Sequence, residues 1–234
     1  IHDGNFRTEK KPLLMDIFMP ASDTLKRRPA ILFVHGGAFL LGSRRNDYMV
    51  ALCDSFARQG YVTATIDYRL GMAAEVSRFF GLVTRINIPE ASSRRAVYRA
   101  TQDARAAVRF LKYQAKEYRI DTTKIFMAGS SAGGFIALKT IYIQQHEVPD
   151  IVFDDPALGN LDSIGINGYS NAKVTAAVSY WGAIENIDFI EQETTPVFMV
   201  HGEDDDIVPF KKGRPLEGIV PPNPIISFNI PETY

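Results

Sequence analysis

The segment Lys124–Gly134, with the sequence KIFMAGSSAGG, indicates the fold of the whole chain. Its first half, KIFMA, is a short apolar run of the kind found in strands buried on both faces of a parallel sheet. Its second half is rich in small residues and opens a helix-like stretch over residues 132–145. The sequence therefore predicts a sharp turn from strand to helix, with Ser131 at its crest.

The residues around Ser131 match what such a turn requires. A side chain on this turn is exposed by a strained backbone, and a Cβ atom two residues before or after it would clash across the turn. Gly129 and Gly133 occupy those two positions, and Gly134 allows the helix to pack closely on the strand. The helix N-terminus would favour negative charge beside Ser131. The alternative interpretation is a glycine-rich turn with an exposed serine, and the G-x-G-x-x-G motif of dinucleotide-binding loops is absent.

Strand-like and helix-like segments alternate along the rest of the chain. The other strand-like runs are residues 13–19, 30–34, 61–66, 174–181 and 196–200, and the other helix-like runs are residues 47–59 and 96–118. In the 96–118 helix, Arg99, Asp103, Arg109 and Lys116 are expected to lie off the apolar face. This alternation predicts one α/β domain, residues 1–234, with a mostly parallel sheet and helices on both faces.

Two segments interrupt the alternation. Residues 71–95 are interpreted as a lid or insert and residues 150–172 as a loop insert, because long connections at the carboxyl edge of such a sheet often shape a ligand site. The alternative for both is surface decoration.

Composition and charge narrow the function classes. The chain has 26 basic and 27 acidic residues, so no bulk positive field exists to hold nucleic acid or an anionic membrane. No apolar run approaches the roughly 18 residues of a transmembrane helix. A single cysteine, Cys53, excludes an intrachain disulfide and a cysteine-rich zinc site. No metal site and no cofactor are predicted, and the sequence determines neither oligomeric state nor compartment.

Two further motifs follow strand-like runs. In His35–Phe39 (HGGAF), small residues would let backbone N–H groups approach a ligand oxygen, with a plain tight turn as the alternative. In His201–Pro209 (HGEDDDIVP), a carboxylate at a strand end could orient a histidine. The alternatives there are an acidic turn or a weak cation site, although the spacing is not that of a calcium loop.

Together these motifs resemble the α/β-hydrolase superfamily, and more narrowly the carboxylesterase/lipase branch related to hormone-sensitive lipase and bacterial sugar-ester esterases. The motifs, in family order, are HGGAF (35–39), DYRL (67–70), DARAAVRFL (103–111), GSSAGG (129–134) and HGEDDDIVP (201–209). The resemblance implies the α/β-hydrolase fold, Ser131 as nucleophile and Asp205 as the acid. It also implies oxyanion donors at the backbone N–H groups of Gly37, Ala38 and Ala132, although the family usually has a third glycine at the position of Ala38.

The general base is where the chain departs from this family pattern. A serine nucleophile needs a base, and in this fold a histidine follows the acid. The four histidines of the chain, His2, His35, His146 and His201, all precede Asp205. His146 is roughly 22 Å from Ser131 along a helix at ~1.5 Å per residue. His35 and His201 are expected to support turns, and terminal His2 is not excluded by geometry. We expect the natural protein to continue past Tyr234 with a last strand, a helix and the base.

The activity implied by the resemblance is hydrolysis of a small or carbohydrate-linked ester through an acyl-enzyme. Phe39, Leu40 and Trp181 are candidates to line the substrate pocket, as are Phe79 and Phe80, and each could equally be ordinary core. Two alternatives stay open. One is a catalytically inactive hydrolase-fold protein that binds a ligand or a protein, and the other is a peptidase of the same fold.

Overall fold

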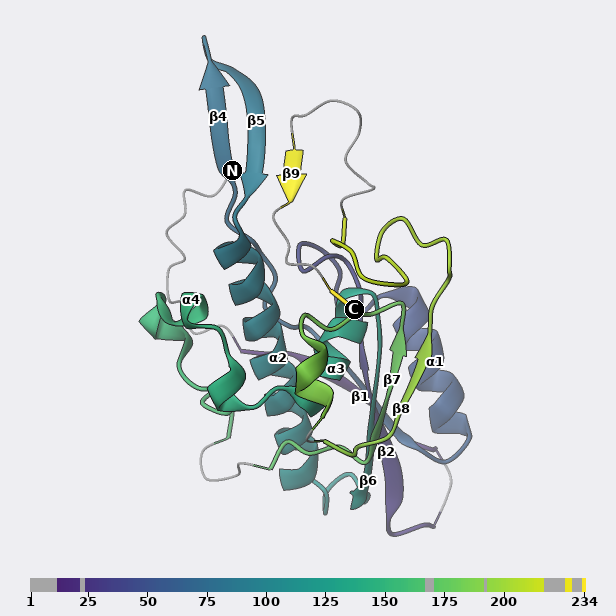
Figure 1. The fold of residues 1–234 in the computed structure, drawn as a ribbon. Helices are drawn as coiled ribbons and strands as arrows, with labels where there is room; N and C mark the ends of the chain where they lie inside the picture. Colours follow the sequence, from purple (N-terminus) through teal and green to yellow (C-terminus); the bar gives the residue numbers. More distant parts are fainter. Residues whose placement is uncertain (1–11, 22–23, 167–170, 192, 217–225, 229–232) are drawn as a thin grey trace.

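The computed structural model describes residues 12–21, 24–166, 171–191, 193–216, 226–228 and 233–234. Its main body is a six-stranded sheet flanked by helices (Figure 1). Across the sheet the strands are β1 (Met15–Phe18), β3 (Val62–Ile66), β2 (Arg28–Val34), β6 (Ile120–Ser130), β7 (Ala176–Tyr180) and β8 (Val197–Val200). Only the β1–β3 pair is antiparallel among these pairings. The predicted mostly parallel sheet is therefore confirmed, and the carboxyl ends of β2, β6, β7 and β8 meet at one edge.

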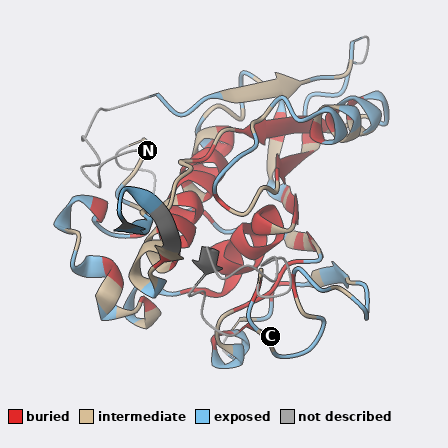
Figure 2. Ribbon diagram, turned by 90° about the horizontal axis from the view of Figure 1, so that it is seen from above, coloured by how far each residue is buried: buried red, intermediate tan, exposed pale blue. Residues whose placement is uncertain are grey.

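Helices cover both faces of this sheet. The helices are α1 (Asp47–Arg58), α2 (Glu90–Tyr113) and α3 (Ala132–Tyr142). Alternate residues of β2 face opposite sides: Leu32 belongs to the large core shared with α2 and α3, and Phe33 to a smaller core shared with α1. Seen from above, the buried residues are concentrated on the central strands and on the helices beside them (Figure 2). In the described part of the chain, no helix is long and apolar enough to cross a bilayer.

Helix α2 is displaced from its predicted bounds, and it is more buried than expected. It begins at Glu90 rather than at residue 96, directly after Pro89, whose fixed φ suits the residue that precedes a helix. The prediction placed Asp103 and Arg109 off the apolar face, yet both side chains are fully buried. The cause is that neighbouring segments cover those faces too, with Arg69 paired to Asp103 and Asp162 paired to Arg109.

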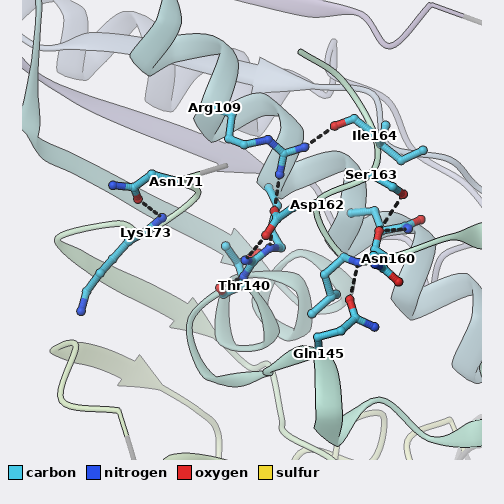
Figure 3. A network of polar contacts seen from close by, with 12 residues as sticks. Arg109, Thr140, Gln145, Asn160, Asp162, Ser163, Ile164, Asn171 and Lys173 are labelled. Atoms are coloured by element: carbon cyan, nitrogen blue, oxygen red, sulfur yellow. Dashed lines mark hydrogen bonds and ion pairs between the residues drawn. The ribbon is translucent and has the colours of Figure 1, made fainter. Parts of the chain in front are cut away.

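The segment predicted as a loop insert at 150–172 packs on α2. It contains α4 (Asp150–Phe153) and a short 3-10 helix, η2 (Pro156–Leu158), and it follows η1 (Gln145–Glu147). Figure 3 shows Arg109 reaching both Asp162 and the carbonyl of Ile164. Lys112 Nζ donates to Asn171 Oδ1 at 2.9 Å. These buried polar contacts hold the described part of the segment against α2.

The segment predicted as a lid or insert at 71–95 contains a β-hairpin and the first turn and a half of α2. The hairpin consists of β4 (Glu75–Phe79) and β5 (Leu82–Ile88), and β9 (Ile226–Phe228) pairs in parallel with the end of β5. This small sheet projects from the body beyond the first turn of α2 (Figure 1). A last 3-10 helix, η3 (Ile187–Ile190), lies between β7 and β8.

Candidate active site

Ser131 occupies the turn between the end of β6 and the start of α3, as the sequence predicts. Its backbone angles are φ 51° and ψ −120°, a region that costs a non-glycine residue on the order of 1–3 kcal/mol. The turn is held from outside, because the Ser131 N–H donates to Tyr180 O of β7 at 2.9 Å. The Ser131 residue is partly exposed. The strained backbone thus places a hydroxyl at the carboxyl edge of the sheet.

The glycines around Ser131 are required by contacts with backbone atoms. A Cβ atom on Gly129 would lie 2.1 Å from Gly133 O, and one on Gly133 would lie 2.0 Å from Val34 O. A Cβ atom on Gly134 would lie 2.9 Å from the Cα of Gly182. Strand β2, strand β6 and helix α3 therefore approach too closely for any side chain at these positions.

The loop that follows β2 passes directly beside Ser131. A Cβ atom on Gly36 would lie 3.2 Å from the Ser131 Cβ and 2.9 Å from Ser130 O. Tyr68 stabilises the start of the loop, since its hydroxyl donates to His35 O at 3.0 Å. The HGGAF motif and the GSSAGG motif, nearly a hundred residues apart, therefore meet at the same edge of the sheet.

Three consecutive residues of this loop have positive φ angles: Gly37 at 116°, Ala38 at 53° and Phe39 at 59°. The turn is closed by Leu40 and Leu41, whose N–H groups both donate to Gly37 O at 2.9 and 3.1 Å. A positive φ is costly for Ala38 and Phe39, and backbone strain of this kind collects at functional sites. The loop is thus a rigid, strained element next to Ser131.

A small cavity of about 40 Å³ adjoins Ser131. Its other lining residues come from eight separate stretches of the chain and are mostly apolar: Ala38, Phe39, Met72, Ser93, Val97, Ala132, Phe135, Glu185, Val208, Pro215, Leu216 and Thr233. Of the predicted pocket residues, Phe39 lines the cavity and is buried. Leu40 and Trp181 are not among its lining residues, and each is 39% exposed. Phe80 lies at the hairpin tip, and the side chain of Phe79 is outside the described part.

Glu185 is a polar residue of this cavity that sequence reasoning missed. Its carboxylate is 7% exposed and bonds to two cations, Lys139 Nζ at 2.9 Å and Arg94 Nη1 at 3.2 Å. A buried carboxylate is tolerated when it is paired in this way. No sequence motif marks Glu185. Glu185 lies on the loop after β7, Lys139 on α3 and Arg94 on α2, and only the fold brings the three residues together.

Asp205 lies in a compact turn whose backbone reaches the cavity at Val208. Its Oδ1 accepts from the N–H groups of Ile207 at 2.8 Å and Val208 at 2.9 Å. Its Oδ2 lies 3.5 Å from Nε2 of His201, and that nitrogen is 2.7 Å from Val208 O. His201 is therefore bonded within the turn, as the sequence predicts for a supporting residue.

No histidine within the described residues lines the cavity. His35 is buried behind the loop, with Nδ1 2.6 Å from Gly36 O and its ring stacked on Tyr68 at 4.3 Å. His146 is exposed on η1 beyond α3. His2, left open by the sequence, lies outside the described residues. Over the same residues, no cluster of three or more His, Cys, Asp or Glu side chains has the form of a metal site.

The buried position of His35 predicts a loss of stability in mild acid. Burial lowers the pKa of the His35 imidazole below its ordinary value of about 6.5. Below that pH the unfolded chain takes up a proton that the folded chain refuses. The contribution of His35 to the free energy of unfolding should therefore be constant above about pH 6.5 and fall below it, by at most about 1.4 kcal/mol per pH unit. Urea denaturation across this range measures the slope.

The matched pair for this measurement is His35→Gln and His146→Gln. The first should remove the contribution of the buried imidazole and flatten the slope, and the second, at an exposed histidine, should leave it unchanged. Equal slopes in all three proteins would contradict the assignment of the effect to His35.

Comparison with known proteins agrees with this geometry. The BD-FAE family matches residues 15–79 and 85–185. A probable isoprenylcysteine alpha-carbonyl methylesterase of Arabidopsis thaliana is 28% identical over 130 residues, which are 56% of this chain. The match spans 22% of that relative's own length.

Solved structures share the fold. Apo Thermogutta terrifontis esterase 2 superimposes with a TM-score of 0.60 at 23% identity, covering 86% of this chain and 71% of that one. The same esterase phosphonylated by cyclosarin gives a TM-score of 0.62 at 22% identity, covering 87% and 71%. The α/β-hydrolase fold expected from the motifs is thereby confirmed. The chain belongs to the BD-FAE family, an esterase-like group within the carboxylesterase branch of the α/β-hydrolases.

Proposed function

We propose that this chain carries the nucleophile and the oxyanion site of a serine carboxylic-ester hydrolase. The observation that carries the proposal is Ser131, held at positive φ on the strand-to-helix turn and opening into a cavity that Ala38 and Ala132 also line. Nucleophilic acyl transfer requires an exposed hydroxyl on a strained turn, with backbone N–H groups close beside it. Membership of an esterase-like family supports the same activity.

In the proposed reaction, Ser131 Oγ attacks the ester carbonyl carbon and its proton passes to a histidine acting as general base. Asp205 orients that histidine. The developing oxyanion accepts hydrogen bonds from the backbone N–H groups of Gly37, Ala38 and Ala132, each worth roughly 10²–10³ in rate. The N–H of Ala132 suits this role because the first residues of a helix have no intrahelical acceptor. The alcohol then leaves, and water hydrolyses the acyl-enzyme.

The cavity favours a short acyl group. One water needs roughly 10–15 Å³ of such space, so about 40 Å³ holds three or four heavy atoms. Apolar walls at Val97, Phe135 and Met72 suit a hydrocarbon chain of two to four carbons, by the same order of magnitude. The proposed substrates are therefore short-chain esters of a small alcohol or a carbohydrate.

Enlarging the cavity should shift the preference towards longer chains. Val97→Ala removes two carbons from the wall, and a methylene in an apolar pocket is worth about 10–200-fold in discrimination. The ratio of kcat/KM for p-nitrophenyl hexanoate to that for p-nitrophenyl acetate should rise about tenfold. Val174→Ala is the matched control, because Val174 is equally buried in the core but does not line the cavity. The same rise in both variants would contradict the proposed acyl site.

Pre-steady-state kinetics of the full-length protein test the acyl-enzyme. Mixing with p-nitrophenyl acetate should release a burst of p-nitrophenol close to one equivalent per chain, followed by slower turnover. The burst should disappear in Ser131→Ala. A burst that persists in Ser131→Ala would place the nucleophile elsewhere.

A second function, a hydrolase-fold protein that binds a ligand without turnover, is favoured by one observation. No described histidine lines the Ser131 cavity. Under that alternative the full-length protein would bind a short-chain ester or acid in calorimetry and release no p-nitrophenol, whereas the proposed hydrolase would release it.

A further inference from the structure

The tip of the β4–β5 hairpin carries apolar side chains in water. Phe80 is 91% exposed and Leu82 is 73% exposed, the two highest values among the described large apolar residues. Seven residues of β5 span about 23 Å at ~3.3 Å per residue, so the tip stands well away from the main sheet (Figure 1). The stem is anchored in the body, since Met72 before the hairpin and Ser93 after it both line the Ser131 cavity.

The backbone conformation at the hairpin tip disfavours an aromatic residue at position 80. Phe79 pairs with Leu82, so Phe80 and Gly81 form a two-residue turn, with φ angles of 48° and 79°. Positive φ at both positions favours Asn or Asp followed by Gly, and it is costly for an aromatic residue. Phe80 therefore costs stability in the turn and gains little from burial. Such local conflicts are expected where a residue serves function.

Charge distinguishes this tip from the other exposed apolar residues. Residues 76–86 contain Arg78 and Arg85 and no acidic residue, in a chain whose net charge is −1. The Arg78 residue is exposed, and its Nη1 donates to Gly81 O at 3.4 Å, beside the tip. The acidic residue that immediately precedes this stretch in the sequence, Glu75, lies at the stem and accepts a hydrogen bond from Asn87 Nδ2 at 3.0 Å. The BD-FAE match is interrupted at residues 80–84, the stretch that contains Phe80 and Leu82.

We propose that the hairpin tip docks on the surface of an anionic lipid bilayer. Phe80 and Leu82 enter the boundary between headgroups and acyl chains, and Arg78 lies at the level of the lipid phosphates. Two apolar side chains with flanking basic charge give the combination of signals that reversible membrane attachment needs. The proposal concerns where the protein sits and does not depend on turnover at Ser131.

Vesicle co-sedimentation tests the proposal with the full-length protein. Binding to vesicles of phosphatidylcholine mixed with phosphatidylglycerol should exceed binding to phosphatidylcholine alone, and salt should weaken it. The double variant Phe80→Asn, Leu82→Thr should lower the partition coefficient by at least about a hundredfold. Arg78→Ser should lower it about fivefold on anionic vesicles only.

The tip variant separates binding from folding. Asn suits the first position of this turn and Thr suits a strand, so thermal unfolding of the double variant should occur at or above the wild-type temperature. The control is Tyr48→Ser, Tyr113→Ser, which removes two other exposed large side chains, 51% and 59% exposed, from the start of α1 and the end of α2. This control should keep full vesicle binding.

Two results would overturn the proposal. One is the absence of binding to anionic vesicles; a change of sedimentation coefficient in the tip variant would then identify the tip as a contact between two copies of the chain. The other is an equal loss of binding in the control variant on α1 and α2, which would indicate unspecific adsorption.

Discussion

Replacing Ser131 by alanine is expected to lower kcat/KM for p-nitrophenyl acetate by at least about 10³-fold in the full-length protein. The reason is that the hydroxyl oxygen forms the bond to the acyl group, and the remaining backbone donors stabilise only a slower attack by water. Steady-state kinetics measure the loss. Ser130→Ala, one residue earlier and buried at the end of β6, should stay within about tenfold of the wild type.

Replacing Ser131 by glycine is expected to stabilise the fold although it abolishes the activity. Glycine adopts the φ of 51° without strain, so Ser131→Gly should raise the free energy of unfolding by about 1 kcal/mol while the activity is lost. Urea denaturation checks this value. A Ser131→Gly protein that is less stable than the wild type would contradict the strained turn, and a fully active Ser131→Ala protein would contradict the nucleophile.

The second large effect is on folding, at Gly133. A Cβ atom there would lie 2.0 Å from Val34 O, and neither backbone can move without separating α3 from β2. Gly133→Ala should therefore lower the free energy of unfolding by about 3 kcal/mol or more, at the upper end of overpacking costs. Chemical denaturation followed by circular dichroism measures the change.

Gly202→Ala is the control for Gly133→Ala. No atom lies within 4 Å of a Cβ placed on Gly202, so this variant should keep the stability of the wild type within about 0.5 kcal/mol. Equal stability of the two variants would show that the close approach of β2 and α3 is not as described.

The turn at Ser131 was predictable because its requirements are local. Glycines at fixed offsets, a short apolar run before them and a helical run after them all lie within eleven residues of sequence, from Lys124 to Gly134. The parallel sheet was predictable for a similar reason, since burial on both faces makes each strand a continuous apolar run. The meeting of the 35–39 loop with Ser131 then followed from the common edge at which parallel strands end.

The remaining features depend on tertiary contacts that no short pattern encodes. Glu185 reaches the cavity wall because Lys139 and Arg94 compensate its charge from two different helices. Asp103 and Arg109 were expected to be off the apolar face, but segments distant in sequence cover them. The hairpin was missed because Phe80-Gly81 lacks the usual Asn-Gly signature of its turn. Leu40 and Trp181 lie outside the cavity lining, since pocket lining depends on side-chain direction rather than proximity in sequence.

The most direct test of the central claim is the site of covalent modification. The full-length protein is incubated with a fluorophosphonate, digested, and the adduct is mapped by mass spectrometry. We predict one adduct per chain, on Ser131, present in Ser130→Ala and absent in Ser131→Ala. An adduct on another residue, or an unmodified Ser131 in a protein that hydrolyses esters, would contradict the account.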